Sequence, residues 1–387
     1  MSLRNVAAIT GYAEFKSQKT ADGLTPMGLT AEIARRAALD AGVSPGEIDG
    51  LLVTTPVAAY SMFWPSAVAE HLGLNLKYFD TVELGGASAA GMVWRAAAAI
   101  QAGLCDRVLC LTVEVPSADR NNNRKGMLRS QAVSEFEIPF GASPPNAGYA
   151  MVARRHMHEF GTKPEQLAKI AVDQRTSALS NPLALFNQHA LTIDDVLNSK
   201  VIFDPLHLLE IVSPCVGGSA VLVTRQSLAN RGPNPPVRLL GAGEAGSHLS
   251  ITHRQDITTS WSKQSAEAAF AMAGVSPARV DVAQLYDCYT IAVLMAIEDL
   301  GFCPKGHGGP FVAERDLTFA GDFPCNTNGG QLSFGQAGAA GGMTHVVEGV
   351  RQLMGRAEAR QVKGATVGVV HGNGGVMSDE VTLVLAN

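Results

Sequence analysis

The chain repeats itself at two pairs of places that lie far apart in the sequence. Residues 41–45 and 273–277 both read AGVSP, and each copy is soon followed by an aspartate. Residues 85–91, GGASAAG, match residues 335–341, GQAGAAG, at five of seven positions. Because both echoes occur in the same order and at similar offsets, they predict two copies of one fold with insertions between them. A duplicated fold of this kind would place equivalent loops face to face.

Composition limits the classes of protein that this chain can be. It has 387 residues, of which 46% are hydrophobic, so two fused halves can share a large core. The net charge is −5 without a Lys/Arg-rich block, so we expect no nucleic-acid partner. The most apolar helical pattern, 87–102, contains Arg95 and Gln101 and is short for a membrane span. The N-terminus has too short an apolar run for a signal peptide. The six cysteines form no CxxC pair, which predicts free thiols and a cytoplasmic location.

Short apolar runs alternate with helical patterns in both halves. In the first half, strands are expected at 6–10, 50–54, 79–83, 107–113 and 218–224, with helices at 26–41 and 87–102. In the second half, strands are expected at 237–243, 282–286, 366–371 and 380–385, with helices at 263–273, 291–300 and within 336–354. This alternation predicts parallel strands covered by helices. A helix rich in Ala and Gly on all sides is typical of a position between two sheets.

Composition also divides the chain into three parts. Residues 116–200 are polar and rich in turn signals, which predicts an inserted loop domain. RGPNPP at 231–236 is typical of a rigid linker. The first half therefore comprises 1–115 plus 201–230, and the second half comprises 236–387.

Five motifs in this order resemble those of the thiolase superfamily. They are GGAS at 85–88, VSPCVGGSAVLV at 212–223, YDCY at 286–289, NTNGGQLSFGQAGAAGG at 326–342 and HGNGG at 371–375. The similarity covers nearly the whole chain and is greatest to the sterol-carrier-protein type of thiolase and to the lipid-transfer-protein or steroid side-chain aldolase branch. The resemblance implies a five-layer αβαβα fold of two duplicated halves with mixed five-stranded sheets. It also implies an acyl-CoA thioester as substrate, with coenzyme A as part of that substrate and no separate cofactor.

Two reactive side chains of that family are absent from this chain. Gly86 stands where the family has its nucleophilic cysteine, and Gln336 stands where it has the activating histidine. Covalent acyl transfer needs a thiolate close to a base, so the ordinary acyl-cysteine route is excluded. Ser88 is the nearest hydroxyl; it is typical of a helix N-cap, and a role as nucleophile is the alternative. Gln336 can still donate a hydrogen bond to a thioester oxygen.

Three other residues are candidates for acid–base chemistry. Tyr286 takes the place of a family active-site residue and could exchange a proton with a substrate oxygen; simple packing is the alternative. Cys288 matches the acid–base cysteine of the sterol-carrier type, a role that requires a lowered pKa, and a buried inert thiol is the alternative. His371 opens a glycine-rich turn, and a histidine at such a place would suit proton transfer. In the aldolase branch tyrosines do this work, and the second such tyrosine would fall near Gln336.

The remaining candidates would bind substrate rather than react with it. The predicted substrate-binding or oxyanion positions are Gly86, Ser88, Asn326, Gly372 and Gly374. For Asn326 a plain turn signal is the alternative. Arg120 and Lys125, in the insertion, could contact the phosphates of coenzyme A, with a solvated loop as the alternative. His156 and His158 have no accompanying ligands, so we expect no metal site.

These residues predict an enzyme of the thiolase or acyltransferase family that acts on acyl-CoA thioesters. The expected reaction is non-covalent cleavage or formation of a carbon–carbon bond, such as the retro-aldol cleavage of a 3-hydroxyacyl-CoA in lipid or steroid metabolism. Tyr286, Cys288 or His371 would supply the base. Gln336 and backbone N–H groups would supply the oxyanion site.

Two alternatives and one assembly are also implied. The chain could be a non-catalytic carrier of acyl-CoA or lipid, or a subunit of a complex with an OB-fold and zinc-ribbon partner. The resemblance further implies a homodimer formed through the first-half sheet around Val82–Val113.

Overall fold

The computed structural model describes residues 2–116, 131–143, 145–247 and 249–387. The first half contains β1 (Ala7–Glu14), α1 (Pro26–Asp40), β2 (Gly50–Val53), α2 (Trp64–Leu72), β3 (Tyr78–Thr81), α3 (Ser88–Gln101), β4 (Arg107–Glu114) and β7 (Gly217–Arg225). The second half contains β8 (Val237–Gly246), α10 (Ser262–Ala273), β9 (Val282–Leu285), α11 (Thr290–Asp299), α12 (Gly308–Glu314), α13 (Gly330–Phe334), α14 (Gly342–Leu353), β10 (Val367–Gly374) and β11 (Asp379–Ala386). Each strand and helix expected from the sequence is present, with small shifts at the ends.

The strands form one mixed sheet in the order β3-β2-β4-β7-β1-β8-β11-β10-β9. The two halves join at β1 and β8, where Ile9 pairs with Val237. The first half supplies five strands, as predicted, and the second half supplies four. In place of a strand equivalent to β3, the second half has a single β-bridge between Ala283 and Cys325. The chain leaves the sheet there because the next residue, Asn326, has a positive φ of 52°.

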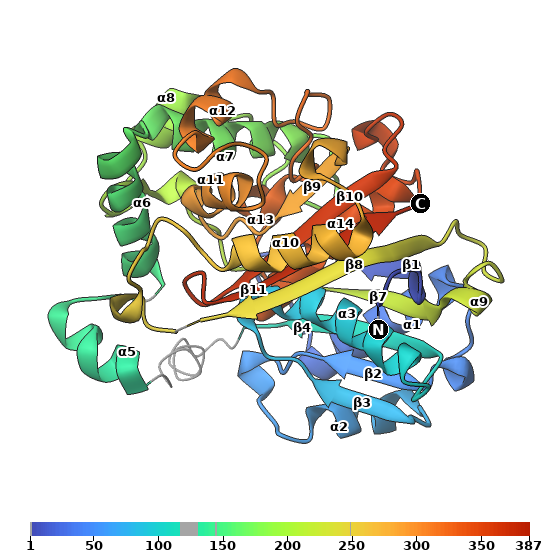
Figure 1. Cartoon of the computed structure of the whole chain (residues 1–387). Coiled ribbons are helices and arrows are strands. Elements are labelled where there is room, and N and C mark those ends of the chain that lie inside the picture. Colours follow the sequence, from blue (N-terminus) through green and yellow to red (C-terminus); the bar gives the residue numbers. More distant parts are fainter. Residues whose placement is uncertain (1, 117–130, 144, 248) are drawn as a thin grey trace.

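The two halves of the sheet form two layers. Helices lie between these layers and on both outer faces, which gives the predicted five layers. Buried side chains of α1 and α2 pack on one face of the first-half strands. Helices α3 and α14 lie together between the two halves and pack against strands of both. Helices α10 and α11 cover the outer face of the second-half strands. Figure 1 shows the first half in blue below the orange and red second half. The fold class expected from the duplication is therefore confirmed.

Buried charges tie the two halves together. Arg351 on α14 lies 2.7 Å from Glu14 on β1 and 2.8 Å from Glu348. Arg360 lies 3.2 Å from Glu348. Burial alone would raise the pKa of Glu348, but Arg360 and Arg351 lower it to about 2. The carboxylate thus contributes stability above its ordinary pKa of 4.5, and this contribution is lost as the pH falls towards 2.

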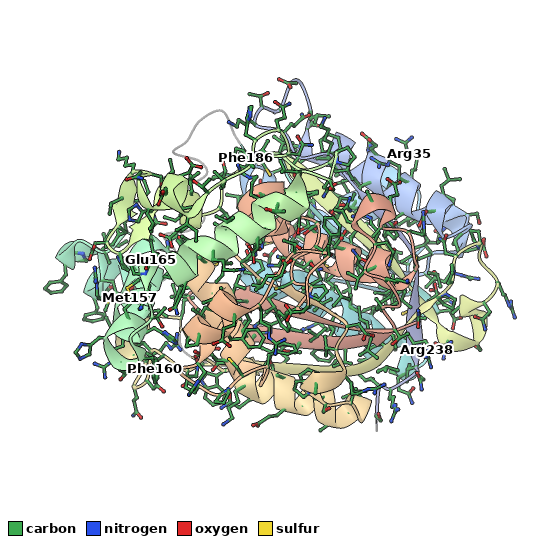
Figure 2. All side chains as sticks on the ribbon, turned by 90° about the horizontal axis from the view of Figure 1, so that it is seen from above. Arg35, Met157, Phe160, Glu165, Phe186 and Arg238 are labelled. Atoms are coloured by element: carbon green, nitrogen blue, oxygen red, sulfur yellow. The ribbon has the colours of Figure 1, made fainter. Side chains whose placement is uncertain are left out.

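The segment expected to be an inserted loop domain is largely helical where it is described. It contains α5 (Gln131–Phe136), α6 (Asn146–Phe160), α7 (Pro164–Ala178) and α8 (Ile193–Leu197), and a short hairpin of β5 (Val201–Phe203) and β6 (Leu206–His207) follows. Figure 2 shows Met157, Phe160 and Glu165 on one side of the molecule, away from Arg35 and Arg238. Helix α6 packs on α11. The division into three domains stays a prediction.

Two absences concern the described part of the chain. None of its helices combines the length and the apolar character that crossing a membrane requires. No three His, Cys, Asp or Glu side chains within it are grouped as a metal site would need.

Candidate active site

The ring of Tyr286 fills the space beside Gly86. Gly86 belongs to the turn Gly85–Ala87 that precedes α3, and it is buried. A Cβ atom added to Gly86 would approach both Cζ and the hydroxyl oxygen of Tyr286 more closely than 3.0 Å, a distance that real Cβ atoms do not reach. The phenol therefore occupies the volume that a cysteine side chain at position 86 would need.

Gln336 holds the Tyr286 hydroxyl from the other side. Its Nε2 atom donates a hydrogen bond of 2.9 Å to the phenol oxygen. The backbone of Gln336 is held in turn by Ser213 and Cys215, through hydrogen bonds of 2.9 and 3.0 Å. The VSPC segment therefore positions Gln336, and the structure brings Gly86, Tyr286 and Gln336 together.

The environment of Tyr286 keeps the phenol protonated. Burial raises the pKa of Tyr286 above its usual value of 10.0, and nearby Cys288 adds to this rise. Hydrogen bonds from Gln336 and Gln331 act in the opposite direction. At neutral pH the group is therefore a neutral phenol that can donate a proton or a hydrogen bond to a substrate oxygen.

Buried polar groups lie beside Tyr286, and of these His345 was not predicted from the sequence. Asp287 accepts hydrogen bonds from the backbone N–H groups of Gln331 and Leu332, at 2.9 and 3.1 Å. His345 on α14 lies 2.9 Å from Asp287 and 3.2 Å from the Gln331 amide. The centre of its ring is 6.0 Å from that of Tyr286. The available signal was a histidine beside the apolar pair Val346 and Val347 in a helix that is buried along its whole length.

Cys288 lies in a neighbouring cluster of hydroxyl groups. Burial raises its pKa well above the ordinary range, although a hydrogen bond with Tyr149 acts against this rise. The Tyr149 hydroxyl donates to Asn373 Oδ1 at 3.3 Å, and its ring stacks on Tyr289 with the centres 4.2 Å apart. The Cys288 thiol is therefore protonated at neutral pH, so it lacks the lowered pKa that the acid–base cysteine of the sterol-carrier type requires.

The His371 side chain points away from Gly86. Its ring nitrogens lie 3.1 Å from Ser262 Oγ and 3.0 Å from Thr382 Oγ1, in the outer layer. The next residue, Gly372, faces the turn instead, because an added Cβ would be 2.8 Å from Ala87 Cα. Alternation along β10 thus puts the imidazole on the opposite face of the strand. Only the backbone oxygen of His371 meets the site, where it accepts from the Tyr286 N–H at 3.0 Å.

The other predicted residues shape the backbone around the site. The Ser88 hydroxyl accepts from the Leu84 N–H at 2.8 Å, so it holds the preceding turn rather than capping the first turn of α3. Asn326 makes two hydrogen bonds with the backbone of Leu285, at 2.8 and 2.9 Å, just before Tyr286. Gly374 lets β10 pass directly against the Leu84 carbonyl.

Arg120 and Lys125 lie outside the described residues. The two candidate phosphate contacts therefore stay predictions.

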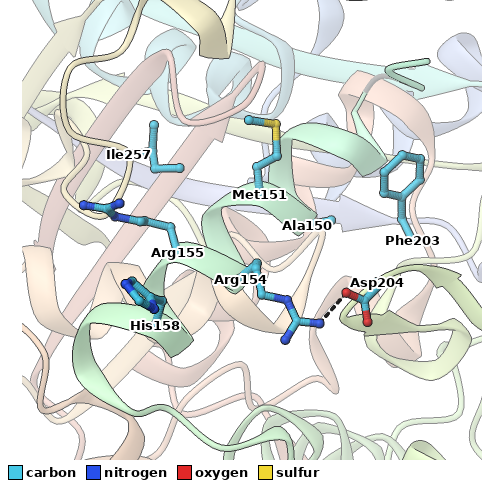
Figure 3. Close-up of a pocket in the computed structure, with 8 residues that line it drawn as sticks. All are labelled: Ala150, Met151, Arg154, Arg155, His158, Phe203, Asp204 and Ile257. Carbon is cyan, nitrogen blue, oxygen red and sulfur yellow. Dashed lines mark hydrogen bonds and ion pairs between the residues drawn. The ribbon is translucent and has the colours of Figure 1, made fainter. Parts of the chain in front are cut away.

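A depression on the surface lies away from these groups. It is shown in Figure 3 and is lined by Ala150, Met151, Arg154, Arg155, His158, Phe203, Asp204 and Ile257. Arg154 forms an ion pair with Asp204 on its rim. None of the groups around Tyr286 contributes to it. The candidate site is thus defined by its convergent buried polar groups rather than by this depression.

Comparison with known proteins agrees with the motifs and the fold. Residues 243–387 match the family model described as Thiolase C-terminal domain-like. The chain is 33% identical over 368 residues to the steroid side-chain-cleaving aldolase of Thermomonospora curvata, with 91% of each chain covered. It is 32% identical over 381 residues to an acetyl-CoA acetyltransferase of Methanothermobacter thermautotrophicus, which covers 96% of this chain and 97% of that relative.

A solved structure shares the whole fold. The protein described as "Ltp2-ChsH2(DUF35) aldolase" superposes with a TM-score of 0.87 at 31% identity, and the match covers 99% of this chain and 98% of that one. Motifs, fold and relatives agree, and the chain belongs to the thiolase superfamily, in its sterol-carrier-protein-type branch.

Proposed function

We propose that this protein is an enzyme that cleaves or forms a carbon–carbon bond in an acyl-CoA thioester without an acyl-cysteine intermediate. The observation that carries the proposal is the placement of the Tyr286 phenol in the volume left by Gly86, with Gln336 bonded to its oxygen. The names of two relatives, both aldolases, support a retro-aldol reaction on a lipid or steroid 3-hydroxyacyl-CoA. A cytoplasmic location suits this chemistry and its free thiols.

The proposed reaction uses Tyr286 as the group that exchanges a proton with the substrate. In the cleavage direction the phenolate form of Tyr286, a small fraction at neutral pH because burial raises its pKa, removes the proton of the 3-hydroxyl group and becomes the phenol. The electrons of the C2–C3 bond then move into the thioester as an enolate, and a carbonyl compound leaves. In the reverse direction the same phenol protonates the new alkoxide. The buried phenol starts this reverse step in the correct protonation state.

Gln336 assists by stabilising the phenolate form of Tyr286. Replacing Gln336 by alanine removes the 2.9 Å hydrogen bond, so the pKa of Tyr286 should rise further. We expect kcat for cleavage to fall about tenfold, the value of one hydrogen bond of roughly 1.4 kcal/mol. Steady-state kinetics would measure this, with Gln101→Ala, an exposed glutamine, as the matched control. Unchanged kcat in Gln336→Ala would remove Gln336 from the mechanism.

The reaction itself is tested with a panel of 3-hydroxyacyl-CoA and 3-oxoacyl-CoA esters of increasing chain length, followed by mass spectrometry. We expect a 3-hydroxyacyl-CoA to yield a shorter acyl-CoA and an aldehyde or ketone. The carrier alternative predicts saturable binding of the same esters with no product from any of them. That second result would overturn the enzymatic proposal.

A second protein subunit is part of the proposal. The name of the solved relative joins Ltp2 to a DUF35 component, which supports a partner of the OB-fold and zinc-ribbon kind. Affinity purification from the native host would test this. Recovery of the chain alone, with full activity, would count against a partner.

A homodimer is proposed at the edge of the first-half sheet. Strand β3 is the terminal strand, and Phe79 on it is 50% exposed. An apolar edge strand is a template for pairing with a second copy. We expect Phe79→Lys to give monomers in light scattering, while Leu39→Lys, at an exposed position on α1, stays dimeric. A wild-type chain that is monomeric at all concentrations would contradict the dimer.

A further inference from the structure

A continuous line of polar side chains runs through the outer layer of the second half. It begins at Glu380 on β11, whose carboxyl oxygen lies 3.1 Å from Nε2 of His371. The same nitrogen lies 3.1 Å from the hydroxyl of Ser262, the first residue of α10. The hydroxyl oxygens of Ser262 and Ser260 lie 2.6 Å apart. Each of these side chains is buried.

The line continues from Ser260 to the surface. The Ser260 hydroxyl donates to Asp299 Oδ2 at 2.8 Å, and the other oxygen of Asp299 lies 2.5 Å from Nζ of Lys305. The Asp299 side chain is fully buried, whereas the Lys305 side chain is 30% exposed. Lys305 is therefore the point at which the line meets water.

The inner end of the line is Glu380, on the side of the cluster that contains Cys288 and Tyr149. Glu380 is directly opposite Asn373 in the β10–β11 register, and Asn373 accepts the hydroxyl of Tyr149. Burial raises the pKa of Glu380, so the group tends to hold a proton. Glu380 in turn contributes to the raised pKa values of Tyr149 and Cys288, which places it within electrostatic reach of both.

The Glu380 carboxyl is fully buried. Contacts with His371 and Ser262 favour its anionic form, but burial outweighs them and raises its pKa. A buried carboxyl is costly as an anion. The other charged or titratable groups that face it are Arg254, Asp299, Tyr149 and Cys288, together with His371.

We propose that this line is a proton path that connects solvent at Lys305 to the Glu380–His371 pair behind Tyr149 and Cys288. In its use by the reaction the path rests on the proposed function, because the enolate left after cleavage must take up a proton at C2. The path supplies that proton from solvent, and the base returns the proton of the 3-hydroxyl group to solvent. The two transfers cancel, so no proton is consumed overall.

The path is tested first without any substrate. Infrared spectra recorded after rapid mixing into D2O follow the carbonyl band of the neutral Glu380 carboxyl, identified by its loss in Glu380→Gln. We expect Ser262→Ala and Ser260→Ala each to slow exchange of this proton by about tenfold or more, because the missing hydroxyl leaves a gap too wide for a hydrogen bond. Ser265→Ala is the matched control. Ser265 lies on the same helix and bonds Thr382, which contacts the other ring nitrogen of His371, so this variant changes a side branch and leaves the line to Lys305 intact.

Two results would overturn the path. One is the absence of any neutral carboxyl band that Glu380→Gln removes. The other is exchange in folded Ser260→Ala and Ser262→Ala that is as fast as in Ser265→Ala. Circular dichroism establishes folding, and either serine variant alone suffices for the comparison.

The link to the reaction is tested separately by kinetics. Ser260→Ala and Ser262→Ala should lower kcat for cleavage by about tenfold with KM unchanged, while Ser265→Ala keeps the wild-type value. Equal kcat in all three variants would show that the enolate takes its proton by another route. If the wild-type protein cleaves no ester, the proposed function fails, and the infrared result still decides whether the path exists.

Discussion

Replacing Tyr286 by phenylalanine is expected to lower kcat for the cleavage of a 3-hydroxyacyl-CoA by about 10²–10⁴-fold, the usual contribution of a positioned acid–base group. The substitution removes only the oxygen to which Gln336 donates its 2.9 Å hydrogen bond. The ring keeps its place beside Gly86, so KM and the unfolding transition should change little. Tyr12→Phe, on β1 and far from the site, is the control for loss of a hydroxyl elsewhere.

The pH dependence gives a second readout of the same residue. Burial raises the pKa of Tyr286 above 10.0, so the phenolate fraction is small at neutral pH and grows with pH. We expect the cleavage rate of the wild type to rise by up to about tenfold per pH unit from about pH 6 to about pH 9, without levelling off. Tyr286→Phe should lose this dependence. A plateau near neutral pH in the wild type would instead indicate a histidine as the base.

Introducing cysteine at position 86 is expected to destroy activity rather than to restore a thiolase. The new side chain would need the volume that the ring of Tyr286 fills, so either the ring or the α3 turn must move. We expect a loss of stability of about 1–3 kcal/mol from overpacking. We also expect cleavage to fall by at least about 100-fold, because Tyr286 loses its alignment with Gln336.

Two controls test whether the effect of Gly86→Cys comes from the clash with Tyr286. Gly46→Cys adds a thiol where nothing lies within 4 Å of the new Cβ, so it should leave stability and activity unchanged. The double variant Gly86→Cys/Tyr286→Ala should be more stable than the sum of the single variants predicts, because the clash is removed. Gly86→Cys that is fully stable and catalyses CoA-dependent thiolysis would contradict the steric argument.

The sequence predicted those parts of the fold that depend on local pattern and on the duplication. Alternating apolar runs and the AGVSP and Ala/Gly echoes led to the correct strands, helices and layers. The single-residue bridge at Cys325 was not predictable, because it depends on the positive φ of Asn326. Helix α6 was missed as well. Small residues such as Ala147, Ala150 and Ala153 form much of its buried face, and these give a weak apolar signal.

The residues of the site that stand at positions of the family motifs were predictable from the sequence. The family motifs predicted Gly86, Tyr286 and Gln336 as site residues, and the structure shows that the phenol of Tyr286 lies between the other two. His345 and Glu380 were not found, because residues distant in sequence surround them and only tertiary structure shows their burial. The raised pKa of Cys288 likewise follows from burial, which its neighbours along the chain do not reveal.

The most direct test of the central claim is a single turnover assay with intact-protein mass spectrometry. The protein is mixed with a cleavable 3-hydroxyacyl-CoA in the absence of free coenzyme A, and both the products and the protein mass are recorded over time. Non-covalent cleavage centred on Tyr286 predicts a shorter acyl-CoA and a carbonyl compound, with the protein mass unchanged throughout. Product that forms only after free coenzyme A is added, together with an acyl adduct on one of the cysteines, would contradict it.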